Sequence, residues 1–215
     1  MAEMKLIVVR TAATELDLQG RVSGRLDLPL SERGEQQAEE AARQLQWEQF
    51  DIVLRAPCQQ AEETADKIAR LMRVRVKVEP ELANIDFGLW HGRRLDDLKK
   101  TLPKAYRCWT EHPEYLYPPE GESIHDAMDR ARTLLERLAR KYAGKSVLLV
   151  TPPPMAALLT SIYSGQDLDV RWCHLPADAG WTSLGTAREA AAKAAAARAA
   201  VATPATPRPA PAVAE

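Results

Sequence analysis

The sequence predicts an α/β fold, a three-layer αβα sandwich around a mainly parallel sheet. Short apolar runs rich in branched residues, such as 6–9, are typical of strands that are buried on both faces. These runs alternate along the chain with amphipathic helical patterns, which favours parallel strands joined by helices. At 215 residues and 46% hydrophobic content, the chain is long enough for one full core and an extension.

The predicted elements follow one another in a regular order. Strands are expected at 6–9, 51–54, 74–78, 146–150 and 181–184. Helices are expected at 31–45, 61–72, 123–142 and 155–163, with short helices between 95 and 117. Ser31 and Ser123 are the predicted N-caps of two of these helices, since a serine oxygen can accept a hydrogen bond from a free N–H of the first turn.

The composition divides the chain into three parts. Residues 1–186 contain the alternating strand and helix patterns and are predicted to form one domain. Residues 187–201 are rich in alanine and predict a helical extension, although they lack large apolar side chains with which to dock. Residues 202–215 are rich in proline and alanine, which predicts a disordered tail.

Charge and cysteine content exclude several classes of function. With 29 Lys+Arg against 30 Asp+Glu, no overall field points to a nucleic acid or a membrane surface. The three cysteines have no metal or redox spacing, so neither a metal nor another cofactor is expected, and the thiols predict a reducing, cytoplasmic location. No apolar run approaches the roughly 18 residues of a membrane span.

Three prolines follow the predicted strand at 146–150, namely Pro152, Pro153 and Pro154. In an α/β protein, the loop between such a strand and its helix is a natural phosphate site because its backbone N–H groups point at the ligand. Proline has no N–H. The sequence therefore predicts the layout of a phosphate enzyme whose chemistry has been removed at this loop.

Several motifs keep a common order along residues 4 to about 185. They are VVR at 8–10, GRVSGRLDLPLSERG at 20–34, Pro57 with Ala61, Thr64 and Ala65, Leu82 with FGLWHG at 87–92, and PPEGES at 118–123. This order resembles the histidine phosphatase superfamily, the phosphoglycerate mutase-like proteins, and within it the α-ribazole phosphatase-like branch. The resemblance implies the same αβα fold.

The resemblance also implies a site whose reacting residues are replaced. Members have a histidine nucleophile directly after the first arginine; here Thr11 follows Arg10. Gln60 stands where they have a second arginine, and Asn84 stands where they have the acid. Pro152 takes the place of a second histidine. Neither a threonine hydroxyl without an adjacent base nor an amide can readily replace an imidazole or a carboxyl group in phosphoryl transfer.

These replacements predict a catalytically inactive pseudoenzyme that acts as a scaffold, assembly subunit or regulatory protein-binding module. A protein partner is expected, through the C-terminal extension or an aromatic face, and a homodimer is possible by resemblance. One alternative is a diverged phosphatase or mutase acting on a small phosphate ester. Another is a non-catalytic sensor that binds an anionic metabolite through Arg10, Arg21 and Arg25.

Arg10 and the aromatic residues of the middle segment each allow two interpretations. Arg10 either holds an anion or is satisfied by backbone carbonyls and Asn84. The aromatic residues of the middle segment form either a small satellite core or a lid with a protein-binding face. They are Trp90, Tyr106, Trp109, Tyr115 and Tyr117.

Overall fold

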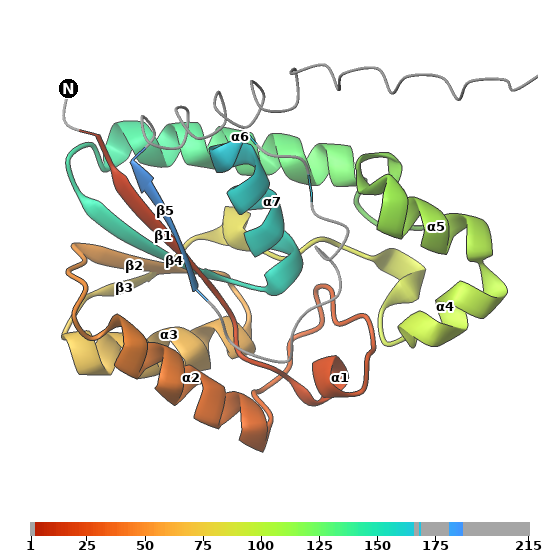
Figure 1. The fold of residues 1–215 in the computed structure, drawn as a ribbon, viewed down its shortest axis with the longest axis horizontal. Coiled ribbons are helices and arrows are strands. Elements are labelled where there is room, and N and C mark those ends of the chain that lie inside the picture. Colours follow the sequence, from red (N-terminus) through yellow and green to blue (C-terminus); the bar gives the residue numbers. More distant parts are fainter. Residues whose placement is uncertain (1–2, 166–167, 169–180, 187–215) are drawn as a thin grey trace, which may run out of the picture.

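A computed structural model describes residues 3–165, 168 and 181–186. In this part of the chain, five strands form one sheet in the order β3-β2-β4-β1-β5 (Figure 1). The strands are β1 (Lys5–Arg10), β2 (Ile52–Arg55), β3 (Val76–Val78), β4 (Ser146–Thr151) and β5 (Trp181–Thr186). All neighbours are parallel except β5, which runs antiparallel to β1 at one edge. The predicted mainly parallel sheet is confirmed.

Helices cover both faces of the sheet and complete the three layers (Figure 1). The helices are α1 (Glu15–Leu18), α2 (Glu32–Leu45), α3 (Gln59–Met72), α4 (Leu95–Thr101), α5 (Pro103–Glu111), α6 (Ile124–Lys141) and α7 (Pro153–Ser164). Short 3-10 turns lie at η1 (Pro80–Leu82), η2 (Gly88–Trp90) and η3 (Pro113–Tyr115). Helix α2 packs against α3, and α6 packs against α7. The predicted αβα sandwich is confirmed.

Local chemistry sets the helix starts. The Ser31 hydroxyl accepts a hydrogen bond from the N–H of Gly34 at 3.0 Å, and the Ser123 hydroxyl does the same for Asp126 at 3.0 Å. Both predicted N-caps are confirmed. Helix α3 begins at Gln59, earlier than predicted, because the Asp27 carboxylate accepts the N–H of Gln59 at 2.7 Å from a distant loop.

The aromatic residues of the middle segment divide into two groups. The Trp109 ring stacks on Phe87 and Trp90, with centroid distances of 4.9 and 5.6 Å, and all three side chains belong to the main core. They therefore extend the main core and do not form a separate satellite. Tyr115 and Tyr117 lie on the surface instead.

The predicted helix at 187–201 and the predicted tail at 202–215 lie outside the described residues. Among the helices that the structure describes, none combines the length and the hydrophobicity that crossing a membrane would require.

Candidate functional site

The candidate site lies where β1 and β4 end side by side. Arg10 is the partner of Thr151 in the parallel register, and the N–H of Thr11 donates to the Thr151 carbonyl at 3.0 Å. The chain leaves β1 towards α2 and leaves β4 into α7, which belong to the two different helix pairs. In open α/β sheets, ligands bind at the carboxyl ends of strands where the connections diverge in this way. The fold therefore places Arg10 and Thr11 at a favoured ligand position.

A single hydroxyl joins the end of β1 to the first turn of α3. The Thr64 hydroxyl oxygen accepts the N–H of Ala12 at 3.2 Å and donates to the carbonyl of Gln60 at 2.7 Å. The structure thus brings Gln60 close to the segment that contains Thr11, as the resemblance implies.

Two polar atoms of these residues are buried without a hydrogen-bond partner in the described part of the chain. They are the hydroxyl oxygen Oγ1 of Thr11 and the amide oxygen Oε1 of Gln60. The two residues are only 4% and 2% exposed. A buried polar group without a partner costs about 1–3 kcal/mol, so these atoms mark either a tolerated defect or a place for a ligand.

Asn84 has a structural role in the loop that follows η1. Its side-chain amide donates to the Gly24 carbonyl at 2.8 Å, and its amide oxygen accepts the N–H of Ile85 at 2.9 Å. The Asn84 backbone carbonyl accepts a hydrogen bond from Arg25 at 2.9 Å. Asn84 therefore links the loop around Gly24 to the loop around Ile85 through hydrogen bonds.

The three arginines predicted to bind an anion differ in their surroundings. Arg21 donates to the Gly92 carbonyl at 2.7 Å and to the Gln19 side chain at 3.0 Å. Arg25 pairs with Glu122 at 3.1 Å and lies 3.7 Å from Asp86. Anion binding by either would require an exchange of partners. Arg10 is half-buried at the end of β1 and directly precedes Thr11 in the chain.

Pro152 is the N-cap of α7, and the next two prolines occupy the first turn. All three are buried, and the Pro152 carbonyl accepts the N–H of Ala156 at 2.9 Å. The loop after β4 therefore has the predicted position at the site, and its three prolines offer no backbone N–H to a ligand.

A charged cluster around Glu122 was not predicted from the sequence. Arg130 of α6 bonds to both carboxylate oxygens of Glu122 at 2.9 and 2.8 Å, and Glu122 also contacts Arg25. His91 accepts the N–H groups of Arg25 and Phe87 at 3.3 and 3.2 Å. Glu122 lies in the PPEGES motif, but the sequence does not show which distant arginines it contacts.

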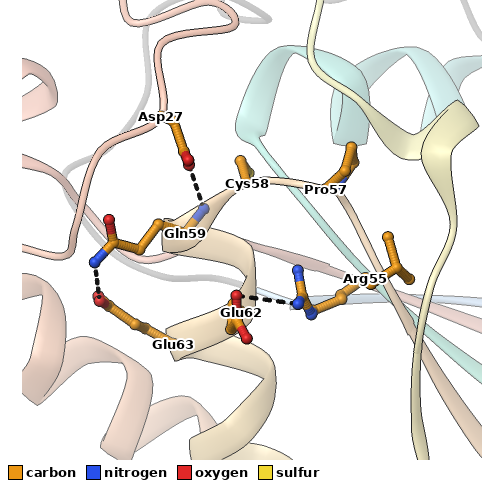
Figure 2. A pocket seen from close by; sticks show the side chains of 8 residues that line it. Asp27, Arg55, Pro57, Cys58, Gln59, Glu62 and Glu63 are labelled. Atoms are coloured by element: carbon orange, nitrogen blue, oxygen red, sulfur yellow. Dashed lines mark hydrogen bonds and ion pairs between the residues drawn. The ribbon is translucent and has the colours of Figure 1, made fainter.

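A pocket of about 560 Å³ lies between the end of β2 and the first turns of α3 (Figure 2). Gln59 faces it and donates to Glu63 at 2.8 Å, while Arg55 pairs with Glu62 at 3.0 Å. The other lining residues are Asp27, Pro57, Cys58 and Val78. Gln59 thus points into this pocket, whereas its neighbour Gln60 is buried and does not line it.

The Cys58 thiol is a poor nucleophile in this setting. Its burial, reinforced by the negative charge of Asp27, raises the pKa of the thiol to about 11. The thiol therefore stays protonated near neutral pH, where the thiolate is the reactive form. The structure agrees with a packing role for Cys58.

A valine at position 11 is expected to raise the free energy of unfolding by about 1 kcal/mol, because it removes an unpartnered buried hydroxyl and keeps the side-chain shape. The matched control is Thr151→Val, since Thr151 is equally buried but donates to the Leu82 carbonyl at 2.8 Å. That change is expected to destabilise by about 1–3 kcal/mol, because it leaves the carbonyl unpaired. Urea unfolding of both variants measures the two signs, and a destabilised T11V would contradict the expectation.

The sequence matches the family described as the histidine phosphatase superfamily (branch 1) over residues 6–197. The chain therefore belongs to this superfamily. It is 32% identical to phosphoserine phosphatase 1 of Hydrogenobacter thermophilus over 170 residues. This match covers 79% of this chain and 80% of the relative. It is 27% identical to the adenosylcobalamin/alpha-ribazole phosphatase of Escherichia coli, over 84% of this chain and 89% of the relative.

A solved structure agrees with these relatives. The native mycobacterial glucosyl-3-phosphoglycerate phosphatase superposes with a TM-score of 0.72 at 26% identity, over 85% of this chain and 89% of that chain. Its name, like the two above, is that of a phosphatase.

These comparisons correct one prediction. The main expectation from the sequence, an inactive scaffold or assembly subunit, is wrong, because the relatives that share most of the chain are named as phosphatases. That expectation relied on the replaced side chains alone and gave too little weight to the frame retained around them. The similarity favours the alternative of a diverged phosphatase.

Proposed function

We propose that this chain is a diverged phosphatase that binds a small phosphate ester at the carboxyl ends of β1 and β4. The observation that carries the proposal is the 32% identity to a phosphoserine phosphatase over about four-fifths of both chains. The position of Arg10 supports it, because the guanidinium group suits bidentate bonds to phosphate and lies at the favoured edge of the sheet.

The residues at this site favour slow hydrolysis by water. Water would attack the phosphorus, and the ester oxygen would leave with a proton to give inorganic phosphate and an alcohol. Arg10 would stabilise the charge on the phosphoryl oxygens. Thr11 and Asn84 supply neither an imidazole nor a carboxyl group, so a covalent phosphohistidine does not form at position 11. Each missing catalytic donor typically costs about 10²–10³ in rate.

A second candidate is a sensor that binds the same class of anion without turnover. The specific observation in its favour is Asn84, because its amide bonds to Gly24 and Ile85 and is not an acid that could protonate a leaving group. This candidate retains the same binding residue, Arg10, so the two candidates share a ligand and differ only in the chemical step.

Phosphate release and calorimetric binding, measured together on the same preparation, separate the candidates. O-phosphoserine and phenyl phosphate are the probes. For the diverged phosphatase we expect slow release that Arg10→Ala abolishes, while Arg43→Ala, a change at an exposed arginine of α2 that pairs with Glu40, leaves it unchanged. Binding without Arg10-dependent release would favour the sensor. An absence of both would overturn the proposal.

The cytoplasmic location, the protein partner and the homodimer stay predictions from the sequence.

A further inference from the structure

We propose that the edge of the sheet at β3 binds an extended protein segment in which acidic and apolar side chains alternate. The bound segment adds one strand beside β3 through its backbone, and its carboxylates pair with basic side chains of the edge. This surface lies at the edge of the sheet opposite β5, and the inference does not depend on the proposed function.

The backbone of β3 is bonded on one side only, because β3 is the last strand at its edge (Figure 1). The carbonyl of Arg75 accepts a hydrogen bond from β2 at 3.0 Å, and the N–H of Glu79 donates to β2 at 2.9 Å. Alternate residues of a strand direct their N–H and C=O groups to opposite sides, so those of Val76 and Val78 point away from β2. Within the described part of the chain, no residue outside the sheet bonds to these two N–H groups. They are available to an added strand.

Basic residues alternate with valines along this edge. Arg73, Arg75 and Lys77 are all exposed, and none of them forms an ion pair with another residue that the structure describes. The acidic residue that follows β3 does not neutralise them, because Glu79 pairs with Arg137 of α6 at 2.8 Å. Three positive charges therefore gather on a short segment, where they attract negatively charged groups.

The side-chain pattern of β3 defines the pattern of its partner. Side chains that stand opposite each other on neighbouring strands lie on the same face of the sheet. An acidic residue opposite Arg75 or Lys77 can therefore pair with that side chain. An apolar residue opposite Val76 or Val78 covers the valine, and Val78 is 49% exposed without a partner. The segment that fits the edge thus alternates between acidic and apolar residues.

The same features argue against two other occupants. A second copy of this chain would bring its own Arg75 and Lys77 to the edge, and like charges directly opposite each other destabilise a strand pair. A nucleic acid supplies negative charge, but it has no alternating N–H and C=O groups at the spacing of a strand. An acidic strand satisfies both the charges and the backbone groups of the edge.

The test measures binding of a labelled peptide to the full chain by fluorescence anisotropy. Glutamate and valine alternate over the about seven residues of the peptide, which is the length of an ordinary strand. We expect saturable binding in about 0.05 M salt that weakens several-fold in about 0.5 M salt, because salt screens exposed charges. A control peptide with lysine in place of glutamate is expected not to bind.

One pair of variants tests the backbone of the edge. Val76→Pro removes an N–H that points away from β2 and breaks no bond to that strand, so we expect binding to weaken by at least about tenfold. Val76→Ala is its control, because it shortens the same side chain and keeps the N–H. The alanine variant should bind within about threefold of the unchanged chain.

A second pair of variants tests the charges. Arg75→Glu combined with Lys77→Glu should weaken binding of the acidic peptide by at least about tenfold and should allow the lysine peptide to bind. The matched control combines Lys104→Glu with Arg107→Glu, which makes the same change of charge at exposed residues of α5. This control should change the affinity for the acidic peptide less than about twofold.

Three results would overturn the inference. The first is an absence of saturable binding of the acidic peptide. The second is equal binding of the lysine peptide, or an unchanged affinity after the double charge reversal. The third is self-association of the free chain in sedimentation that Val76→Pro abolishes, because the edge would then belong to a second copy. If Val76→Pro does not fold, the charge reversal still decides, since its two residues are exposed. Each of these results leaves the proposed phosphatase standing, because phosphate release tests it separately.

Discussion

Replacement of Arg130 by alanine is expected to lower the free energy of unfolding by about 3–5 kcal/mol. The guanidinium group of Arg130 bonds to both oxygens of Glu122 and donates to the carbonyls of Glu81 and Ala83 at 2.7 and 2.9 Å. The Arg130 and Glu122 side chains are only 19% and 15% exposed. Truncation would therefore take the bidentate partner from a largely buried carboxylate, which keeps Arg25 as a cationic partner at 3.1 Å, and would leave two carbonyls without this donor.

The matched control lies on the same helix. Arg132 pairs with Asp129 within one turn of α6, and both side chains are about half exposed. Arg132→Ala is therefore expected to cost no more than about 0.5 kcal/mol. Urea unfolding of both variants gives the comparison. A loss below about 1 kcal/mol for R130A, or equal losses for the two variants, would show that the cluster does not hold the loop after η1.

Much of the fold could be predicted from the sequence because the signals are local. The apolar run at 6–9 lies in β1, and the caps Ser31 and Ser123 start α2 and α6 as expected. The start of α3 differs from the prediction, and there a contact between distant segments is the cause. Helix α3 starts at Gln59 because Asp27, far away in the sequence, caps its first N–H. A propensity pattern contains no information about such a partner.

The candidate site could be predicted only in part. The motif order located Thr11, Gln60 and Asn84, and the structure brings the segments of the first two together. The burial of these side chains and their hydrogen-bond partners could not be predicted, because both depend on the whole fold. Asn84 has structural bonds to two loops, whereas Gln60 has an unpartnered oxygen. The two amide side chains, Asn84 and Gln60, therefore have different roles in the structure, although both stand where the family has a charged residue.

Gly34→Ala is expected to destabilise the protein by about 1–3 kcal/mol, although alanine is normally the better helix former by about 1 kcal/mol. Gly34 lies in the first turn of α2, and a Cβ there would collide with the carbonyl oxygen of Ala13. That oxygen cannot easily move, because it accepts hydrogen bonds from both the N–H and the hydroxyl of Ser31, each at 2.9 Å. The collision therefore outweighs the gain in propensity.

The same substitution connects stability to the site. Ala13 lies two residues after Thr11, so a shift of its carbonyl would also displace the segment that ends β1. We expect G34A to weaken phenyl phosphate binding as well as to lower the unfolding midpoint in urea. Gly20→Ala is the control, since a Cβ at Gly20 meets no atom within 4 Å and only the left-handed backbone, with φ of 64°, is strained. That strain costs about 1–2 kcal/mol and should leave binding unchanged. Equal effects of the two variants on binding would mean that the contact between α2 and Ala13 does not position the site.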